Sequence, residues 1–169
     1  MREYIFDATV LSSFAAADQL SVLEARYRGV DFTTIEVSDE LQRGVKAGYE
    51  HLAPALHQIE TVKPGGWLRV LTPRSAGEHR LRTVLDRSLD PGEASCLALA
   101  ASRGLTLATD DLAARSLAEG EGVSLTGTLG VLVALVRDNA LSLPEADAML
   151  EAMIERRYRS PVDKLDDLI

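Results

Sequence analysis

Acidic residues recur in this sequence where an apolar, strand-like run gives way to a helix. In a chain whose strands are parallel, all turns from strand to helix open on the same edge of the sheet, and ligands bind there. Carboxylates gathered at that edge repel one another unless a hard cation such as Mg²⁺ or Mn²⁺ lies between them. The pattern therefore predicts metal-assisted chemistry on a phosphate group. The acids are Asp7 after residues 4–6, Glu40 after residues 31–37, Glu93 in the turn 90–95, and Asp110 and Asp111 after residues 105–109.

Each of these acids also has a purely structural interpretation. An acid in the first turn of a helix is stabilised by the helix dipole and by unpaired backbone N–H groups, by about 0.3–1 kcal/mol. Glu93 could be only the third-position member of a capping box that begins at Asp90. Asp7 fits this interpretation least well, because it directly follows a short apolar run. Any single acid is more often a cap than a ligand, and it is the combination that favours a site.

Other catalytic chemistries find less support. The three histidines, at 51, 57 and 79, lack the spacing of a metalloprotease, and Cys96 has no partner for a zinc site or a disulfide. Cys96 lies in an apolar run, which predicts a buried structural thiol. There is no phosphate-binding P-loop, no dinucleotide fingerprint and no nucleophile elbow. A phosphatase with an aspartate nucleophile would need a second Asp where Thr9 stands.

The net charge is -8 over 169 residues, which counts mildly against promiscuous binding of nucleic acid but not against a metal-bridged site. Arginine supplies 15 of the 18 basic residues, and its side chain can bind phosphate through two parallel hydrogen bonds. Taken alone, each arginine cluster is best interpreted as a solvated helix face. The clusters are Arg80, Arg82 and Arg87, and Arg156, Arg157 and Arg159.

Helical and strand-like patterns alternate along the chain, which predicts a mostly parallel sheet of about five strands covered by helices. Ser38 is the expected N-cap of a helix that runs from Asp39 towards Ile59, with an interruption near Gly48 or Pro54. The expected strands are 4–6, 30–37, 67–71, 105–109 and 123–126. The other expected helices are 10–28 with a break near 17–18, 75–89, the apolar helix that opens at 90–93 and stops at Gly104, 112–120, 129–138 and 144–157.

The length and the absence of a long linker predict one domain over residues 1–169. No apolar stretch approaches the roughly 20 residues that a membrane span needs. The chain opens on Met1-Arg2-Glu3 and enters a strand-like run at once, which leaves no room for a signal peptide. We therefore expect a cytoplasmic protein.

The order of the acids and the residues around them resemble the PIN domain family. Asp7-Ala8-Thr9 is similar to the first acid of that family, and Val37-Ser38-Asp39-Glu40-Leu41 to the second. Gly92-Glu93-Ala94-Ser95 resembles its Gly-Glu step before an apolar helix, and Thr109-Asp110-Asp111 its late acids at a strand end. The stretches 110–115 and 127–132 resemble a PIN-like subgroup described as toxins. The resemblance covers residues 1 to about 160, although the stretch 47–85 matches none of its motifs.

This resemblance implies a three-layer α/β/α fold and Mg²⁺- or Mn²⁺-dependent hydrolysis of RNA phosphodiester bonds. Many such proteins are VapC-like toxins that form dimers and are inhibited by a cognate antitoxin. By the same resemblance, Asp7, Glu40, Glu93 and Asp111 would be the catalytic metal ligands, Asp110 an adjacent ligand, and Thr9 and Thr109 supporting hydroxyls. The alternative is a non-catalytic PIN-like module that binds protein or RNA and whose acids are helix caps.

Overall fold

The computed structural model describes residues 1–169 and contains one five-stranded sheet. All strand pairs are parallel, and the strand order is β3-β2-β1-β4-β5. The first strand in sequence is therefore central, and the chain moves outward from it in both directions. The strands are β1 (Tyr4–Phe6), β2 (Asp31–Thr34), β3 (Arg69–Leu71), β4 (Thr106–Ala108) and β5 (Leu125–Thr126).

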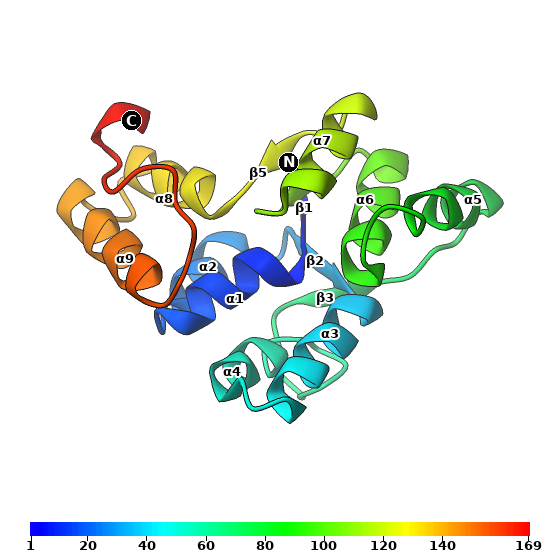
Figure 1. Cartoon of the computed structure of the whole chain (residues 1–169), viewed down its shortest axis with the longest axis horizontal. Coiled ribbons are helices and arrows are strands. Elements are labelled where there is room, and N and C mark those ends of the chain that lie inside the picture. The colour runs from blue at the N-terminus through cyan, green and yellow to red at the C-terminus, as the bar shows by residue number, and fades with distance from the viewer.

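Helices cover both faces of the sheet and complete the three-layer α/β/α fold (Figure 1). Helices α5, α6 and α7 lie on one side, and α1, α2, α8 and α9 lie on the other. The helices are α1 (Ala8–Ala16), α2 (Leu20–Tyr27), α3 (Ile35–Lys46), α4 (Ala53–Leu56), α5 (Ala76–Leu85), α6 (Pro91–Arg103), α7 (Leu112–Gly120), α8 (Thr128–Arg137) and α9 (Leu143–Glu155), with 3-10 turns η1 (Glu50–Leu52) and η2 (Asp166–Leu168). None of these helices has the length and apolarity needed to cross a membrane.

A cluster of 38 buried apolar residues fills the space between these layers. Phe6 at the end of β1 makes edge-to-face contacts with Tyr27 and with Trp67, at centroid distances of 5.1 and 6.5 Å. Cys96 of α6 is a free, buried thiol, as predicted, and burial raises its pKa. The central strand and α6 are thus fixed by packing, and they carry Asp7 and Glu93.

The boundary between β2 and α3 differs from the sequence prediction. The strand was expected to reach Val37, but it ends at Thr34, and α3 begins at Ile35. The hydroxyl of Thr34 accepts the backbone N–H of Val37 at 3.3 Å and caps the helix, so Ser38 is not the N-cap. Glu40 consequently lies in the second turn of α3.

Most other boundaries agree with the prediction to within a few residues. Helices α1 and α2 are separated at Asp18, whose φ of 56° ends the first helix. Helix α3 ends at Lys46, just before Gly48, whose φ is 102°. Gly104 takes the left-handed conformation after α6, with a φ of 69°. The predicted helix 112–120 is α7 without any change of bounds.

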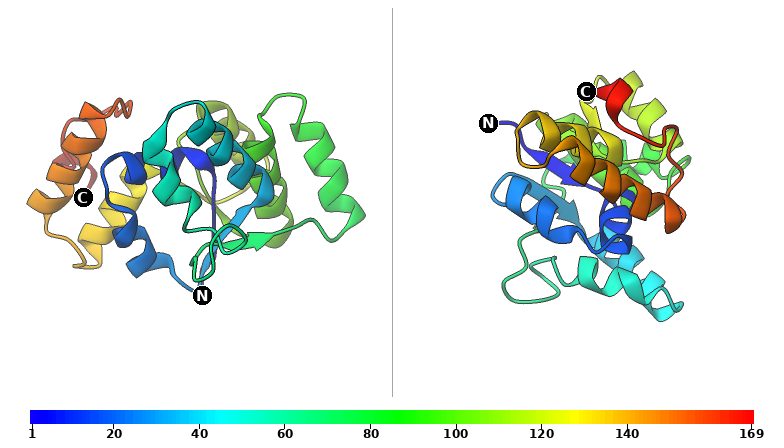
Figure 2. Two further views of the ribbon diagram at one scale, coloured as in Figure 1. Left: turned by 90° about the horizontal axis from the view of Figure 1, so that it is seen from below. Right: turned by 90° about the vertical axis from the view of Figure 1, so that its left-hand side faces the viewer.

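The chain after α9 folds back along α8 and α9 (Figure 2). Leu165 is fully buried there, and its backbone N–H donates to the Asp147 carboxylate at 2.8 Å. Arg137 of α8 donates to the Leu168 carbonyl at 3.3 Å. The C-terminal segment is therefore attached to the last two helices at more than one point.

Candidate active site

Asp7 lies directly after the central strand and is only 1% exposed. Its backbone N–H donates to the Ala108 carbonyl at 3.1 Å, which fixes the end of β1 beside the end of β4. One carboxylate oxygen accepts the backbone N–H and the hydroxyl of Thr9 at 2.9 and 2.6 Å, and the other accepts the Thr109 hydroxyl. Desolvation outweighs these hydrogen bonds and raises the pKa of Asp7 from 3.8 to about 7.

Asp7 is also the N-cap of α1, although the sequence suggested that it fits this role least well. Strand β1 ends at Phe6 and α1 begins at Ala8, so a single residue both leaves the strand and caps the helix. Its extended backbone, with φ -85° and ψ -179°, suits both roles. Asp7 is therefore both a helix cap and a buried residue. A helix cap does not need to be buried, so the capping role does not explain the burial of Asp7.

Thr9 and Thr109 connect Asp7 to the turn after β4. The Thr9 hydroxyl donates to Asp7 and accepts the backbone N–H of Asp110 at 2.9 Å. The Thr109 hydroxyl donates to Asp7 and accepts the backbone N–H of Asp111 at 3.1 Å. Each hydroxyl group therefore bridges the end of β1 and the end of β4, and together they position both acids after β4.

Glu40 and Glu93 bring two further carboxylates to the same edge of the sheet. Helix α6 runs back towards β4, so its first turn lies at the carboxyl edge of the strands, beside α3. A Cβ atom placed on Gly92 would lie 2.6 Å from a carboxylate oxygen of Glu40, so the Glu40 side chain lies directly against the first turn of α6. Burial, followed by repulsion from Glu93 and Asp90, raises the pKa of Glu40.

Three helices begin with the same capping box, in which a glutamate reaches back to the N-cap backbone N–H. Hydrogen bonds from an arginine and from backbone N–H groups lower the pKa of Glu78 to about 2, and hydrogen bonds from Ser142 lower that of Glu145. Glu93 behaves in the opposite way, because burial and then repulsion from Asp111 and Asp7 raise its pKa from 4.5 to about 7. The same type of cap thus gives opposite shifts, and the difference comes from burial and from the carboxylates around Glu93, including its own N-cap Asp90.

The two acids after β4 point in different directions. Both oxygens of Asp110 accept hydrogen bonds from Thr128, one from the backbone N–H at 2.8 Å and one from the hydroxyl at 2.6 Å. Burial raises the pKa of Asp110, and these hydrogen bonds oppose the shift. Asp111 caps α7 with one oxygen, which accepts the Ala114 N–H at 2.7 Å, and its other oxygen makes no hydrogen bond. Asp111 therefore has a free oxygen, whereas Asp110 fixes the start of α8.

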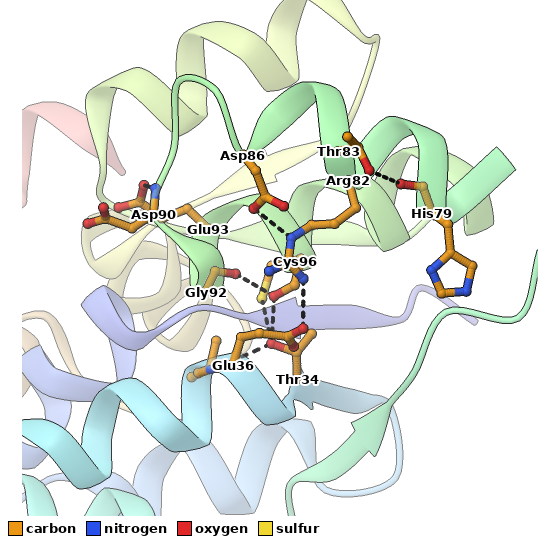
Figure 3. Close-up of polar contacts among 12 residues, drawn as sticks. Thr34, Glu36, His79, Arg82, Thr83, Asp86, Asp90, Gly92, Glu93 and Cys96 are labelled. Atoms are coloured by element: carbon orange, nitrogen blue, oxygen red, sulfur yellow. Dashed lines mark hydrogen bonds and ion pairs between the residues drawn. The ribbon is translucent and has the colours of Figure 1, made fainter. Parts of the chain in front are cut away.

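No basic side chain forms an ion pair with these acids. The structure contains five ion pairs, and none includes Asp7, Glu40, Glu93, Asp110 or Asp111. Two of them involve Arg82 of α5, which lies between Glu36 of α3 and Asp86 (Figure 3). Arg82 is thus held in ion pairs, whereas the sequence was interpreted as placing it on a solvated helix face. It forms an ion pair with Glu36, which lies one helical turn before Glu40 in α3.

The donors at this edge suit a hard divalent cation, because they are carboxylate and hydroxyl oxygens. The pairwise repulsion that raises the pKa of Glu93 is also what a cation would relieve. However, no group of three or more acidic, histidine or cysteine side chains lies close enough to hold one metal ion. Gathering these carboxylates around an ion would therefore need changes in side-chain conformation.

Sequence reasoning missed the hydroxyl groups that align α3 and α6. The Ser95 hydroxyl contacts the Thr34 hydroxyl at 2.8 Å and donates to the Gly92 carbonyl at 2.8 Å. Thr34 and Gly92 are labelled in Figure 3, where they lie between the first turns of the two helices. These contacts hold Glu93 near Glu40. Ser95 belongs to the Gly-Glu-Ala-Ser stretch, but its partner lies 61 residues earlier in the chain, so no local pattern indicates this contact.

Comparisons with known proteins identify the family and the fold. A family model described as DUF3368, PIN domain, matches residues 3–169. The chain belongs to the PIN domain family. Its fold is similar to the crystal structure of PAE2754 from Pyrobaculum aerophilum, with a TM-score of 0.51 and 22% identity over 83% of this chain and 98% of that one. No curated protein sequence matches the chain.

Membership of the PIN domain family agrees with the fold and gives the acids a chemical context. PIN domains are generally nucleases, and PIN nucleases generally use divalent metals. The likeness to the solved structure concerns the fold, namely the parallel sheet with helices on both faces.

Proposed function

We propose that this PIN domain is a ribonuclease that uses Mg²⁺ or Mn²⁺ to hydrolyse RNA phosphodiester bonds. One observation carries the proposal. Carboxylates from four separate segments lie at one edge of the sheet, none of them in an ion pair with a lysine or arginine, and one of them is almost fully buried. Buried, unpaired carboxylates are costly, and they concentrate at sites where chemistry needs them. The four acids are Asp7, Glu40, Glu93 and Asp111.

In this proposal Asp7 is the central ligand, because the two threonine hydroxyls fix its position. Asp111 offers the oxygen that does not cap α7, and Glu93 and Glu40 complete the set from α6 and α3. Asp110 is adjacent and acts mainly by holding α8. A bound divalent ion would polarise the scissile phosphate and lower the pKa of a water molecule. A carboxylate of this set that is not bound to the cation would act as the general base.

Unpaired RNA is the proposed substrate. Its exposed backbone can approach a narrow acidic edge, and a cation bridges the phosphate and the carboxylates. The need for this bridge is consistent with the net charge of -8, which would otherwise repel a polyanion.

We further propose that the protein is the toxin of a toxin–antitoxin pair, acts in the cytoplasm and forms a homodimer. Its support is the resemblance of residues 110–115 and 127–132 to the toxin subgroup. Light scattering at micromolar concentration should give the mass of two chains, and a monomer would contradict the dimer. Co-expression with a neighbouring reading frame should yield a complex, and its failure to co-purify would contradict the toxin role.

A second candidate function is a PIN-like binding module without catalysis. Asp7, Asp111 and Glu93 each accept a backbone N–H at a helix start, so each contributes as a cap. Glu40, in the second turn of α3, has no such role. In this alternative the acids stabilise the fold, and the surface serves a partner.

The two candidates are separated by incubating labelled single-stranded RNAs of varied sequence with the protein and Mn²⁺, Mg²⁺ or a chelator. We expect cleavage with either cation, none with the chelator, and loss of cleavage in Asp7→Asn, which keeps the shape of the side chain but not its charge. Glu145→Gln, in the matching capping box of α9, should cleave like the wild type. Equal cleavage by Asp7→Asn, or no cleavage of any RNA, would contradict the proposal.

A further inference from the structure

A cavity of about 250 Å³ opens beside the acidic edge. Thr9, which holds Asp7, and Asp110 both line this cavity. The wall opposite them comes from the end of α9 and the residues that follow it. A molecule bound here therefore lies next to the carboxylates described above.

The charge of this cavity is opposite to that of the protein as a whole. Arg156, Arg157, Arg159 and His51 line it, and none of the three arginines belongs to any of the five ion pairs. The only carboxylate in the wall is Asp110, and both of its oxygens are occupied by Thr128. Three exposed guanidinium groups thus converge without an acidic partner in a chain of net charge -8.

The backbone that carries these arginines is held on both sides. Met153, the last fully buried residue of α9, precedes them. Arg157 has a φ of 76°, a left-handed conformation that is unfavourable for arginine and turns the chain at the mouth of the cavity. Tyr158 is half-buried next to Asp110 and Thr128, and Leu165 is fully buried further along. The arginines therefore extend from a segment whose backbone is anchored by buried residues on both sides.

Arginines near the end of a helix also have a structural explanation, because a positive charge there is stabilised by the helix dipole. This effect fades beyond the last turn. It accounts for Arg156, which is the C-cap of α9, but not for Arg159, which lies past the left-handed turn. The dipole also gives no reason for the side chains to share one cavity with Thr9.

We propose that this arginine-lined cavity binds a phosphate group of the RNA strand next to the phosphate that is cleaved. The inference rests on the proposed ribonuclease function and adds where the flanking strand lies. Guanidinium groups bind phosphate oxygens in pairs, and the Ser12 hydroxyl in the cavity wall can donate another hydrogen bond. In this proposal the acids bind the cation, and the arginines bind the phosphate backbone of the RNA, for which the acidic chain otherwise has little affinity.

RNA is favoured over an acidic peptide as the occupant because the cavity shares Thr9 and Asp110 with the acidic edge. A strand whose scissile phosphate lies at Asp7 must continue on one side or the other, and the cavity provides a positive path. An acidic peptide would satisfy the arginines equally but has no reason to adjoin that edge.

The test measures RNA binding separately from cleavage. A labelled single-stranded RNA is titrated in chelator with the Asp7→Asn protein, alone and combined with Arg157→Gln and Arg159→Gln, and anisotropy gives the affinity. The matched control replaces Arg80 and Arg87 by Gln, two exposed arginines of the α5 region that form no ion pair. We expect the combined Arg157→Gln and Arg159→Gln substitutions to weaken RNA binding by about tenfold. They should also reduce the salt slope, which is the dependence of the logarithm of affinity on the logarithm of salt concentration, by about 1.4, since each phosphate contact on a single strand contributes about 0.7. The control should change neither.

Lysine at both positions should restore the salt slope, because the charge returns. Equal binding by the Arg157 and Arg159 variant and the control would overturn the inference. Loss of binding to a polyglutamate peptide with unchanged RNA binding would overturn it as well and assign the cavity to an acidic protein. If the arginine variants lose RNA binding while the wild type cleaves no RNA, the cavity stands and the ribonuclease function fails.

Discussion

Replacing Asp7 by Asn should change the pH dependence of stability in a way that a simple helix cap would not. Burial raises the pKa of Asp7 from 3.8 to about 7 in the folded protein. Between these values the folded state holds a proton that the unfolded state has lost, so the folded state binds more protons. Stability contributed by this group therefore falls as pH rises from about 4 to about 7 and then levels off. Asn cannot titrate and abolishes this dependence.

The size of the effect follows from the shift. From pH 5 to pH 8 the wild type should lose about 3 kcal/mol through Asp7 alone, at about 1.4 kcal/mol for each unit between pH 5 and the folded pKa. Asn also replaces one acceptor oxygen with a donor that faces Thr9 or Thr109, which costs about 1–3 kcal/mol at every pH. The informative quantity is therefore the difference between the two proteins at two pH values, in which this constant cost cancels.

Urea denaturation of both proteins at pH 5 and pH 8, in chelator, measures this difference. We expect Asp7→Asn to gain on the wild type by about 3 kcal/mol between the two conditions. Glu145→Gln is the matched cap variant: hydrogen bonds from Ser142 lower the pKa of Glu145, so its titration lies below this window and its effect should not vary across it. A difference for Asp7→Asn that is the same at both pH values would refute the assignment of Asp7 as a desolvated acid.

Three shorter predictions concern the neighbours of Asp7. Glu93→Gln should stabilise the cation-free protein at pH 8, whereas Glu145→Gln should destabilise it, and thermal melts of both variants check the opposite signs. Millimolar Mn²⁺ should raise the melting temperature of the wild type more than that of Asp111→Asn, because a ligand that binds only the folded state stabilises it by RT ln(1 + [L]/Kd), which falls as binding weakens. Thr109→Val should cost about 1–3 kcal/mol in urea denaturation, since it removes a donor to Asp7 and leaves a backbone N–H unpaired; an unchanged midpoint would contradict that bridge.

The sequence predicted the position of the acids better than their surroundings. Strands β1 and β4 could be found because short apolar runs end at an acid, and parallel pairing then requires that Asp7 and Asp111 share an edge. The start of α3 was misplaced because Ile35-Glu36-Val37 has strand-like residue types. The hydroxyl of Thr34 caps a helix there, and its contact with Ser95 cannot be seen locally.

Protonation could not be predicted, because it depends on neighbours from distant segments. The boxes that contain Glu93 and Glu145 look alike in sequence, each with a proline in the first turn. Only in the first do two other carboxylates come near, from residues 7 and 111. The role of the arginines was hidden for the same reason. Arg82 and Arg157 both looked like solvated helix residues, yet one is paired with α3 and the other lines a cavity beside Asp110.

Calorimetric titration of Mn²⁺ into the wild type tests most directly whether this edge is a metal site. Metal ligands must be deprotonated, so binding at about pH 6.5 should release protons from Asp7 and Glu93, whose pKa values are about 7, and release should vanish at about pH 8.5. Titrations in two buffers of different ionisation enthalpy give the number of protons. We expect release in the wild type and in Glu145→Gln, and weaker binding with less release in Asp7→Asn. No binding of Mn²⁺, or binding that Asp7→Asn leaves unchanged, would contradict the account.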